Sequence, residues 1–276
     1  MSPDLSAIGR LLLVGGGNMG GAMARGWLDA GLPQGALHLL DPRPGPAMRD
    51  LVEAGRLTHS TGVPSATFDV VLLAVKPQMM AEVLPGLRPV LKPGSLVISV
   101  AAGTTTATIA EGLGAAAIVR AMPNTPALIG RGITGCFAAP GVGEEARRAA
   151  EALLSASGPV VWVATEAEID LVTAVSGSGP AYVFLLAEAL AAAGAEAGLD
   201  PDLAMTLARH TVAGAGELML RSDEAPAQLR RNVTSPNGTT QAALDVLMAE
   251  DGLAPLLRRA VASAARRAAE LSEPAK

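Results

Sequence analysis

Three glycines near the start of the chain have the spacing of a phosphate-binding turn. Gly15, Gly17 and Gly20 form G-x-G-x-x-G directly after the apolar run LLLV at 11–14. In such a turn the first glycine allows a tight bend, the second lets the backbone approach a pyrophosphate, and the third lets the next helix pack on the strand. A helix at 18–30 would direct its N-terminal N–H groups and dipole at the phosphates. The pattern predicts a dinucleotide site.

An acidic residue follows at the distance that such a site requires. Asp41 lies about 20 residues beyond Gly20, at the end of the apolar run 36–40. A carboxylate there accepts hydrogen bonds from ribose hydroxyls and favours NAD, whereas a nearby arginine can hold the extra phosphate of NADP. The chain offers both Asp41 and Arg43, so NADH and NADPH both stay open as the cofactor. A glycine turn without a ligand is the alternative, but the surrounding strand, helix and acid favour a site.

Further apolar runs have the spacing of strands in one sheet. Strands are predicted at 69–75, 95–100, 116–120, 133–138 and 159–163. Repeated strand–helix–strand units are typical of an α/β fold with a doubly wound, Rossmann-like, mostly parallel sheet, which binds ligands beyond the carboxyl ends of its strands. The segments at those ends are the candidate cofactor site: Gly15, Gly16, Gly17, Asn18, Met19, Lys76, Ala101, Ala102, Gly103, Met122 and Asn124.

The chain changes character after residue 165. No later apolar run has the pattern of a strand, and helices are predicted at 166–175, 180–197, 201–220 and 239–271, the last broken near Gly252. We therefore predict a dinucleotide-binding domain at 1–165 and an all-α domain at 166–276. The helix at 180–197 is apolar or small nearly all round, which predicts burial on every side. A small helical domain cannot easily cover it, so we expect a second copy of the chain to do so.

The loop at 234–240, TSPNGTT, could bind a small carboxylate. It offers backbone N–H groups and hydroxyls at the N-terminus of a predicted helix, where the helix dipole favours an anion. The alternative is an ordinary helix cap that uses one of the hydroxyls.

Composition excludes several other functions. Half of the residues are apolar and 2% are aromatic, and the net charge of −5, without any basic run, argues against a nucleic-acid partner. The single cysteine, Cys136, excludes an internal disulfide and a cysteine metal cluster, and we expect it to be buried. His38, His59 and His210 have no metal-ligand spacing, so no metal is expected.

The predicted location is cytoplasmic, without a membrane. The N-terminus lacks a basic segment followed by a secretory apolar core. The most apolar helix, at 181–197, is shorter than the roughly 20 residues of a membrane span, and it carries Glu188 and Glu196.

In their order along the chain, these motifs resemble those of the pyrroline-5-carboxylate reductases nearly end to end. The matching blocks are GGGNMG at 15–20, AVKPQ at 74–78, SVAAG at 99–103, RAMPNTP at 120–126, SGSGPAY at 176–182 and VTSPNGTT at 233–240. VTSPNGTT is the most specific of them. The resemblance implies a dinucleotide-binding domain followed by a helical domain that forms an interlocked homodimer, with further assembly into rings of dimers such as a homodecamer.

The resemblance also implies an activity, the reduction of 1-pyrroline-5-carboxylate by NADH or NADPH to L-proline, the last step of proline synthesis. Ser235, Gly238 and Thr239 would then bind the substrate carboxylate, and the hydroxyl of Thr240, the implied catalytic residue, would lie near the ring nitrogen. Further cofactor contacts that it implies are Asp41, Arg43, Thr61, Ala74, Val75, Lys76 and Pro77.

The chain departs from the family pattern at particular positions. Asn237 stands where many members have glycine, and asparagine tolerates a positive φ better than most residues. Thr61 stands where the family often has an asparagine that touches the cofactor. An acid that precedes the family's loop corresponds to Asp223 or Glu224, and both stay open.

Hydride attack on a protonated cyclic imine neutralises a charge already on the substrate. The reaction therefore needs positioning rather than a metal or a covalent nucleophile. A β-hydroxyacid dehydrogenase is one alternative, but it needs a lysine on the helical domain, and the lysines here are Lys76, Lys92 and Lys276. A non-catalytic NAD(P) sensor is the other, and it would need no carboxylate loop.

Overall fold

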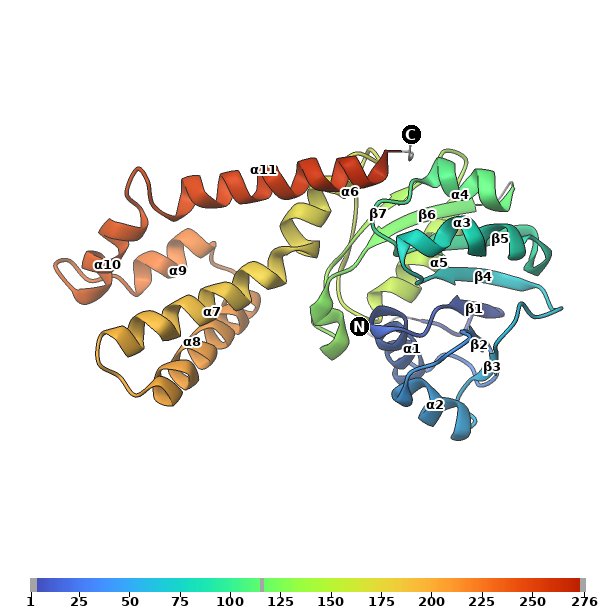
Figure 1. Ribbon diagram of the computed structural model, residues 1–276, viewed down its shortest axis with the longest axis horizontal. Helices are drawn as coiled ribbons and strands as arrows, with labels where there is room; N and C mark the ends of the chain where they lie inside the picture. Colours follow the sequence, from blue (N-terminus) through green and yellow to red (C-terminus); the bar gives the residue numbers. More distant parts are fainter. Residues whose placement is uncertain (1–3, 115–116, 274–276) are drawn as a thin grey trace. The chain divides into compact units, whose positions relative to one another are not determined.

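The computed structural model describes residues 4–114 and 117–273. The chain forms two compact units, one of residues 1–177 and 264–276 and the other of residues 178–263 (Figure 1). The first unit extends beyond residue 165, where the sequence predicts the end of the dinucleotide-binding domain. Compact units and functional domains divide a chain by different criteria, so the boundary at 165 stays a prediction.

An eight-stranded sheet forms the centre of the first unit, in the order β3-β2-β1-β4-β5-β6-β7-β8. Neighbouring strands are parallel except β6 and β7, which are antiparallel. This confirms the doubly wound, mostly parallel sheet. The order changes direction between β1 and β4, the kind of switch point at which such sheets bind ligands. The strands are β1 (Leu11–Val14), β2 (Leu37–Leu40), β3 (Thr58–Ser60), β4 (Phe68–Leu73), β5 (Leu91–Ser99), β6 (Ala117–Met122), β7 (Thr134–Ala138) and β8 (Val160–Trp162).

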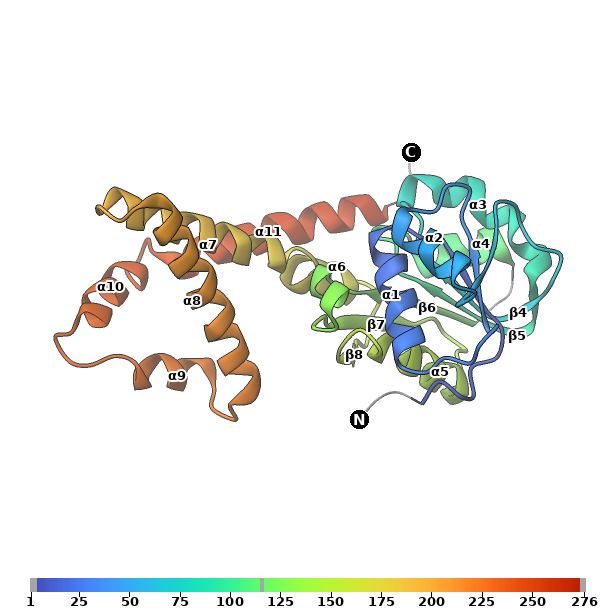
Figure 2. The same cartoon turned by 90° about the horizontal axis from the view of Figure 1, so that it is seen from below.

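Both faces of the sheet are covered, which explains the unbroken apolar runs of its central strands. Alternate residues of β1 belong to two different hydrophobic clusters, Leu11 and Leu13 to one and Leu12 and Val14 to the other. Helices α1 (Asn18–Asp29), α2 (Pro46–Glu53) and α5 (Glu144–Ser155) pack on the first face. Helices α3 (Met80–Gly86) and α4 (Thr106–Leu113) pack on the second (Figure 2).

One side chain fixes the position of α1 on its face of the sheet. Trp27 of α1 is fully buried, and its indole Nε1–H donates to the carbonyl of Leu153 in α5 at 2.7 Å. Because a buried indole N–H needs a partner, this bond holds α1 against α5. The N-terminus of α1 is thereby set beyond the end of β1.

The strand boundaries differ from the prediction at several ends. The sequence predicts no strand at Thr58–Ser60, yet β3 forms because its backbone pairs with β2, His38 opposite Thr58. The strand predicted at 69–75 ends at Leu73, and β6 continues to Met122 through its antiparallel pairing with β7. Ala116, the predicted start of β6, lies outside the described residues.

The segment that leads out of the sheet is helical. It consists of α6 (Glu168–Val172), followed by a π-helical turn (Thr173–Gly177). The second unit then contains α7 (Gly179–Glu196), α8 (Pro201–Arg221), α9 (Pro226–Asn232) and α10 (Thr239–Leu247), while α11 (Leu253–Ser272) belongs to both units. The break near Gly252 is confirmed. The sequence did not predict α9.

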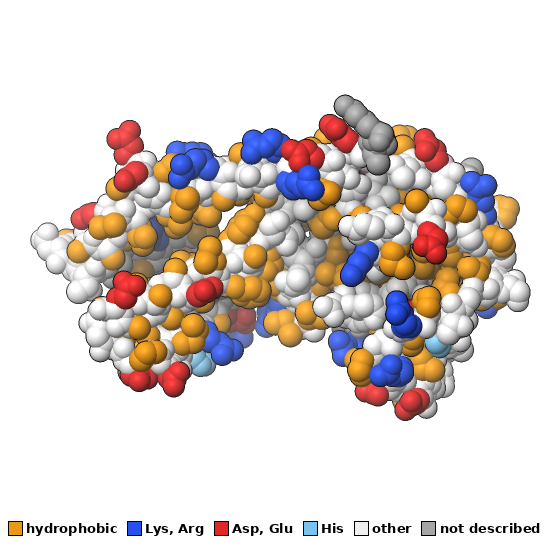
Figure 3. Space-filling view, viewed as in Figure 1, with side chains coloured by type: hydrophobic (Ala, Val, Ile, Leu, Met, Phe, Trp, Pro, Cys, Tyr) orange, Lys and Arg blue, Asp and Glu red, His pale blue; other side chains and the backbone are white. Residues whose placement is uncertain are grey.

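Within one chain, α7 is not buried on every side. It packs on α8 through small residues, and Ala191, Ala204 and Ala208 are the buried residues of these two helices. Its large apolar side chains are open, with Phe184 66% and Leu185 61% exposed. Apolar side chains accordingly lie at the surface over these helices (Figure 3). A single chain leaves this face uncovered, as expected for a helix that needs a second copy.

Candidate dinucleotide and carboxylate sites

The three glycines of the turn have the separate roles that their spacing predicts. Gly15 has φ +96°, and a Cβ there would lie 2.8 Å from the carbonyl oxygen of Ala74. A Cβ on Gly20 would collide with the carbonyl oxygen of Gly15, so α1 can pack this close only with glycine there. A Cβ on Gly17 would meet nothing within 4 Å. Gly17 therefore borders open space at the start of α1.

The N-terminus of α1 is free to hold an anion. Gly17 occupies the N-cap position, and no side chain caps the helix. The first N–H groups of a helix have no intrahelical partner. With the open side of Gly17 beside them, these groups form a cradle of the size and polarity that a pyrophosphate needs.

Asp41 is held at the end of β2 by hydrogen bonds to its side chain. Its Oδ2 accepts the Gly16 N–H at 2.7 Å, and its Oδ1 accepts the Arg43 N–H at 2.8 Å. The Asp41 carbonyl accepts a hydrogen bond from Nε2 of His59 at 2.8 Å. The carboxylate thus lies directly beside the glycine turn.

A cavity of about 520 Å³ lies next to this carboxylate. It brings together many of the residues that the sequence analysis singles out: Gly15, Gly17, Asp41, Arg43, Thr61, Ala74, Val75 and Lys76. Sequence reasoning missed the apolar wall, which Val63, Met79, Val83 and Leu87 provide. The i, i+4 spacing of Met79 and Val83 after the KPQ segment is the signal that could have found it.

The remaining predicted cofactor residues lie elsewhere around the carboxyl ends of the strands. Gly16 is buried behind the turn, Asn18 and Met19 begin α1, and Pro77 begins the 3-10 turn η1 (Pro77–Met79). Ala101, Ala102 and Gly103 follow β5, and Met122 and Asn124 lie at the end of β6. Since β4, β5 and β6 are neighbouring parallel strands, these segments share one edge of the sheet.

Two residues at this edge also have structural roles. Gly103 has φ +68°, and a Cβ there would lie 2.7 Å from the carbonyl oxygen of Leu271 in α11. Oδ1 of Asn124 accepts the N–H of Ile133 at 3.0 Å, which ties the end of β6 to the segment before β7. The amide nitrogen of the Asn124 side chain and the second lone pair of Oδ1 are left for a ligand.

The 234–240 loop forms a tight turn before α10. The N–H of Gly238 donates to the carbonyl of Ser235 at 3.1 Å, and Asn237 has φ +57°, which asparagine tolerates. Gly238 is the N-cap of α10, and no side-chain hydrogen bond caps the helix. The predicted alternative of an ordinary hydroxyl cap is therefore not what the loop forms. The N–H groups of Thr239 and Thr240 are left without intrahelical partners.

Comparisons with known proteins decide the family. A family model described as pyrroline-5-carboxylate reductase dimerisation matches residues 166–271, and one described as NADP oxidoreductase, coenzyme F420-dependent, matches residues 10–103. A pyrroline-5-carboxylate reductase from Pseudomonas aeruginosa is 42% identical over 96% of this chain and 97% of its own length. The chain belongs to the pyrroline-5-carboxylate reductase family.

Solved structures agree with this assignment. The reductase from Coxiella burnetii superposes with a TM-score of 0.90 at 37% identity, covering 96% of this chain and 99% of its own. The Plasmodium falciparum reductase, solved with NADP bound, has a TM-score of 0.81 at 27% identity, covering 99% of this chain and 100% of its own. The prephenate dehydrogenase of Aquifex aeolicus, 15% identical with a TM-score of 0.53, shares the fold alone. As a family member with a dimerisation domain, the protein is an NAD(P)H-dependent oxidoreductase and a homo-oligomer.

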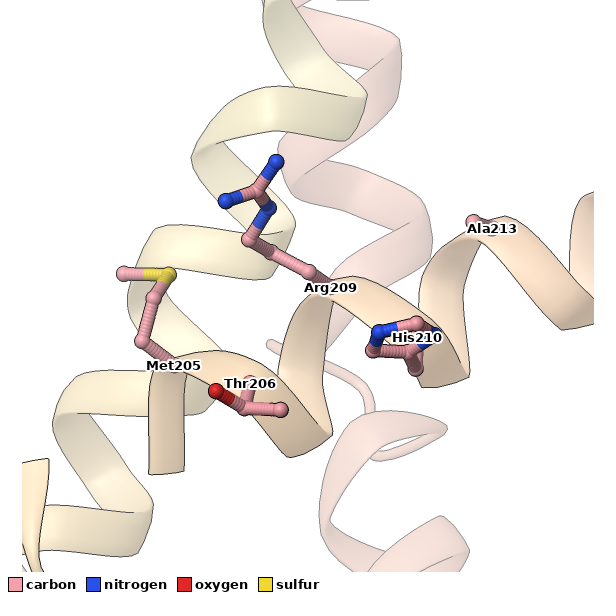
Figure 4. Close-up of a pocket in the computed structure, with 5 residues that line it drawn as sticks. All are labelled: Met205, Thr206, Arg209, His210 and Ala213. Carbon is pink, nitrogen blue, oxygen red and sulfur yellow. The ribbon is translucent and has the colours of Figure 1, made fainter. Parts of the chain in front are cut away.

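A second hollow in this reductase contains none of the predicted site residues. It has a volume of about 330 Å³, and all of its lining side chains come from α8 (Figure 4): Met205, Thr206, Arg209, His210 and Ala213. It is an open stretch of helix surface on the dimerisation domain.

Sequence reasoning also missed a buried charge cluster near the carboxyl end of β6. Arg120 of β6 is 1% exposed, and its guanidinium contacts Asp170 at 3.1 Å and Glu166 at 3.5 Å. Glu166 in turn accepts the N–H of Thr106 at 2.7 Å, and Nη2 of Arg120 donates to Oγ of Ser272 at 3.2 Å. An arginine inside the apolar strand AIVRAM was the signal. The cluster joins β6 to α4, α6 and the end of α11.

The single cysteine and one of the histidines lie in structural surroundings within the first unit. Cys136 is fully buried, as predicted, and burial raises the pKa of its thiol to about 12. His38 lies between the hydroxyls of Thr58 and Ser60, each 2.8 Å from a ring nitrogen. Among the described residues, no group of histidine, cysteine, aspartate or glutamate could hold a metal ion.

Proposed function

We propose that this protein reduces 1-pyrroline-5-carboxylate to L-proline with NADH or NADPH, as the last step of proline synthesis. The observation that carries the proposal is the match, over nearly the whole of both chains, to a protein named pyrroline-5-carboxylate reductase. The open glycine cradle and the uncapped loop before α10 support it, because they offer one site for a pyrophosphate and one for a small carboxylate.

The proposed cofactor site lies along the carboxyl edge of the sheet. We assign the pyrophosphate to the backbone of Gly15, Gly16, Gly17, Asn18 and Met19, whose cradle fits such a group. We assign the adenosine end to Asp41, Arg43 and Thr61. The nicotinamide end is assigned to the segments after β4, β5 and β6: Ala74, Val75, Lys76, Pro77, Ala101, Ala102, Gly103, Met122 and Asn124. When bound, the reduced nicotinamide supplies a hydride.

The proposed substrate site is the turn before α10. The hydroxyl of Ser235 and the N–H of Thr239 hold the carboxylate. Gly238, whose own N–H is bonded to the Ser235 carbonyl, has no side chain to block its approach to the N-terminus of α10. The Thr240 hydroxyl, one turn position further on, orients the ring nitrogen by a hydrogen bond. The protein's residues thus bind and orient a substrate whose protonated nitrogen already makes the neighbouring carbon electrophilic.

We further propose that 1–165 and 166–276 act as the cofactor and dimerisation domains, that dimers assemble into rings such as a decamer, and that the protein is cytoplasmic. Among the described residues, one helical stretch, Glu168–Glu196, is long and apolar enough to cross a membrane. It falls within the matched dimerisation domain, so we assign its apolar surface to a partner subunit. The net charge of −5 disfavours nucleic acid.

The proposal is tested by steady-state oxidation of reduced cofactor. Consumption should require 1-pyrroline-5-carboxylate, and β-hydroxy acids with oxidised cofactor should give no reaction. Turnover of a β-hydroxy acid would instead support a dehydrogenase. Cofactor binding without turnover of either substrate would support a sensor.

A further inference from the structure

Asp41 and Arg43 both line the cofactor pocket. A carboxylate favours an unphosphorylated adenosine ribose and an arginine favours a 2′-phosphate, but the two side chains are held in place to different degrees. Four hydrogen bonds hold Asp41 in place. Its backbone N–H donates to the carbonyl of Ser60 at 3.2 Å, its carbonyl accepts from His59, and its two carboxylate oxygens accept the N–H groups of Gly16 and Arg43. Turning the side chain aside for a ligand would break both hydrogen bonds to its carboxylate.

The carboxylate still has room for a diol. An ionised carboxylate offers about four acceptor sites, and backbone N–H groups occupy one on each oxygen of Asp41. The sites left free suit the paired 2′ and 3′ hydroxyls of an unphosphorylated ribose, which are donors. A 2′-phosphate, largely dianionic near pH 7, replaces one of these donors and brings like charge against the carboxylate.

Withdrawal of the carboxylate would be costly. The bond from Gly16 is part of the glycine turn, and a Cβ on Gly16 would already lie 3.3 Å from Oδ2 of Asp41. Moving the carboxylate aside would leave the N–H groups of Gly16 and Arg43 without their acceptor. A complex with NADPH therefore has either repulsion between the 2′-phosphate and the Asp41 carboxylate or two unpaired N–H groups, those of Gly16 and Arg43.

The side chain of Arg43 does not offset this cost of binding NADPH. Its backbone N–H serves Asp41, whereas its side chain is exposed, and among the described residues no ion pair or hydrogen bond fixes its guanidinium. An exposed, mobile ion pair contributes little and is screened by salt. The other charged residues lining the pocket, Lys76 and Glu82, balance each other, so the pocket as a whole does not attract a further anion.

We propose that Asp41 makes this protein select NADH over NADPH, and that Arg43 does not reverse the choice. The inference rests on the proposed cofactor site. The Plasmodium falciparum relative was solved with NADP bound, so the shared fold does not itself exclude the 2′-phosphate. The selectivity is a property of this chain's own residues.

Equilibrium binding tests the proposal without turnover. Dissociation constants are measured by calorimetry for NAD⁺ and NADP⁺, and for the fragments 5′-AMP and adenosine 2′,5′-bisphosphate, with the full-length protein. NAD⁺ and 5′-AMP should bind at least tenfold more tightly than their 2′-phosphorylated partners. Equal or tighter binding of NADP⁺ would overturn the inference but keep the site. Failure of all four ligands to bind would overturn the site as well.

Variants assign the effect to one residue. Asp41→Ser keeps a small acceptor near Gly16 and removes the charge, and it should shift the NAD⁺ to NADP⁺ affinity ratio at least tenfold toward NADP⁺. Arg43→Gln should leave the preference for NAD⁺ over NADP⁺ in place, while in the Asp41→Ser background it should weaken the binding of NADP⁺. An unchanged ratio in Asp41→Ser would contradict the role of Asp41. If Asp41→Ser does not fold, the same NAD⁺ to NADP⁺ affinity ratio is measured in Asp41→Asn, which keeps the shape of the side chain.

Discussion

At the residue scale, the roles of the turn's glycines can be distinguished by the atoms that a Cβ at each position would contact. Gly17 has φ −69° and open space at the Cβ position, so Gly17→Val adds bulk without strain. We expect cofactor affinity to fall at least tenfold, while the melting temperature falls much less than in Gly15→Val, as measured by calorimetry and circular dichroism. Gly15→Val is the matched control. At φ +96° and against Ala74, it should lower stability itself. Wild-type affinity in Gly17→Val would remove the pyrophosphate from this turn.

Thr240 distinguishes catalysis from helix capping. The N-cap of α10 is Gly238, so loss of the Thr240 hydroxyl removes no cap. Thr240→Val keeps the branched shape and removes the hydroxyl. We expect kcat/KM to fall about tenfold or more, because each loss of about 1.36 kcal/mol in transition-state stabilisation lowers the rate tenfold. The melting temperature should stay unchanged, whereas a lost cap would cost about 1 kcal/mol of stability. A variant with normal kinetics and reduced stability would return Thr240 to a structural role.

At the scale of elements, β2 and β3 are joined by a histidine that makes stability depend on pH. Burial, and then the nearby charges of His59 and Arg10, hold the pKa of His38 below its ordinary value of 6.5. The unfolded chain therefore binds a proton at His38 more readily than the folded chain. The contribution of His38 to the free energy of unfolding is fully present above pH 6.5, and it is lost as pH falls through the lowered folded-state pKa.

Chemical denaturation between pH 7.5 and 5 measures this effect. The free energy of unfolding should decrease toward pH 5 in the wild type, and His38→Asn should show a smaller decrease. His210→Asn, on the exposed face of α8, is the control and should behave as wild type. An equal pH dependence in His38→Asn and wild type would show that His38 is not the responsible group.

The elements also show how far sequence reasoning reached. The buried strands and the glycine turn were predictable, because unbroken apolar runs and a fixed glycine spacing are local signals. Strand β3 was not, because the polar THS segment is a strand only through its pairing with β2. The apolar wall at Val63 and Met79 and the partners of Arg120 were missed for the same reason, since they come together only in the folded chain.

At the scale of the whole molecule, the exposed face of α7 requires a partner subunit. Apolar surface is worth about 25 cal/mol per Å² when it is removed from water, and Phe184 and Leu185 are mostly exposed in one chain. We expect sedimentation to show no folded species of 27.7 kDa at micromolar concentration. Phe184→Asp should dissociate or unfold the protein, while Val161→Asp in β8, an exposed apolar site of the first unit, should keep the oligomer. A stable, folded 27.7 kDa wild-type species would contradict this expectation.

The central claim, that the protein transfers a hydride from a nicotinamide to the imine carbon of 1-pyrroline-5-carboxylate, is tested most directly by isotope transfer. The protein is supplied with substrate and with NADH that carries deuterium in place of both hydrogens on carbon 4 of the nicotinamide, and the product is analysed by mass spectrometry and NMR. The account predicts L-proline that carries one deuterium at carbon 5, in equal amount to the cofactor oxidised. Cofactor oxidation without deuterated proline, or no oxidation at all, would contradict it.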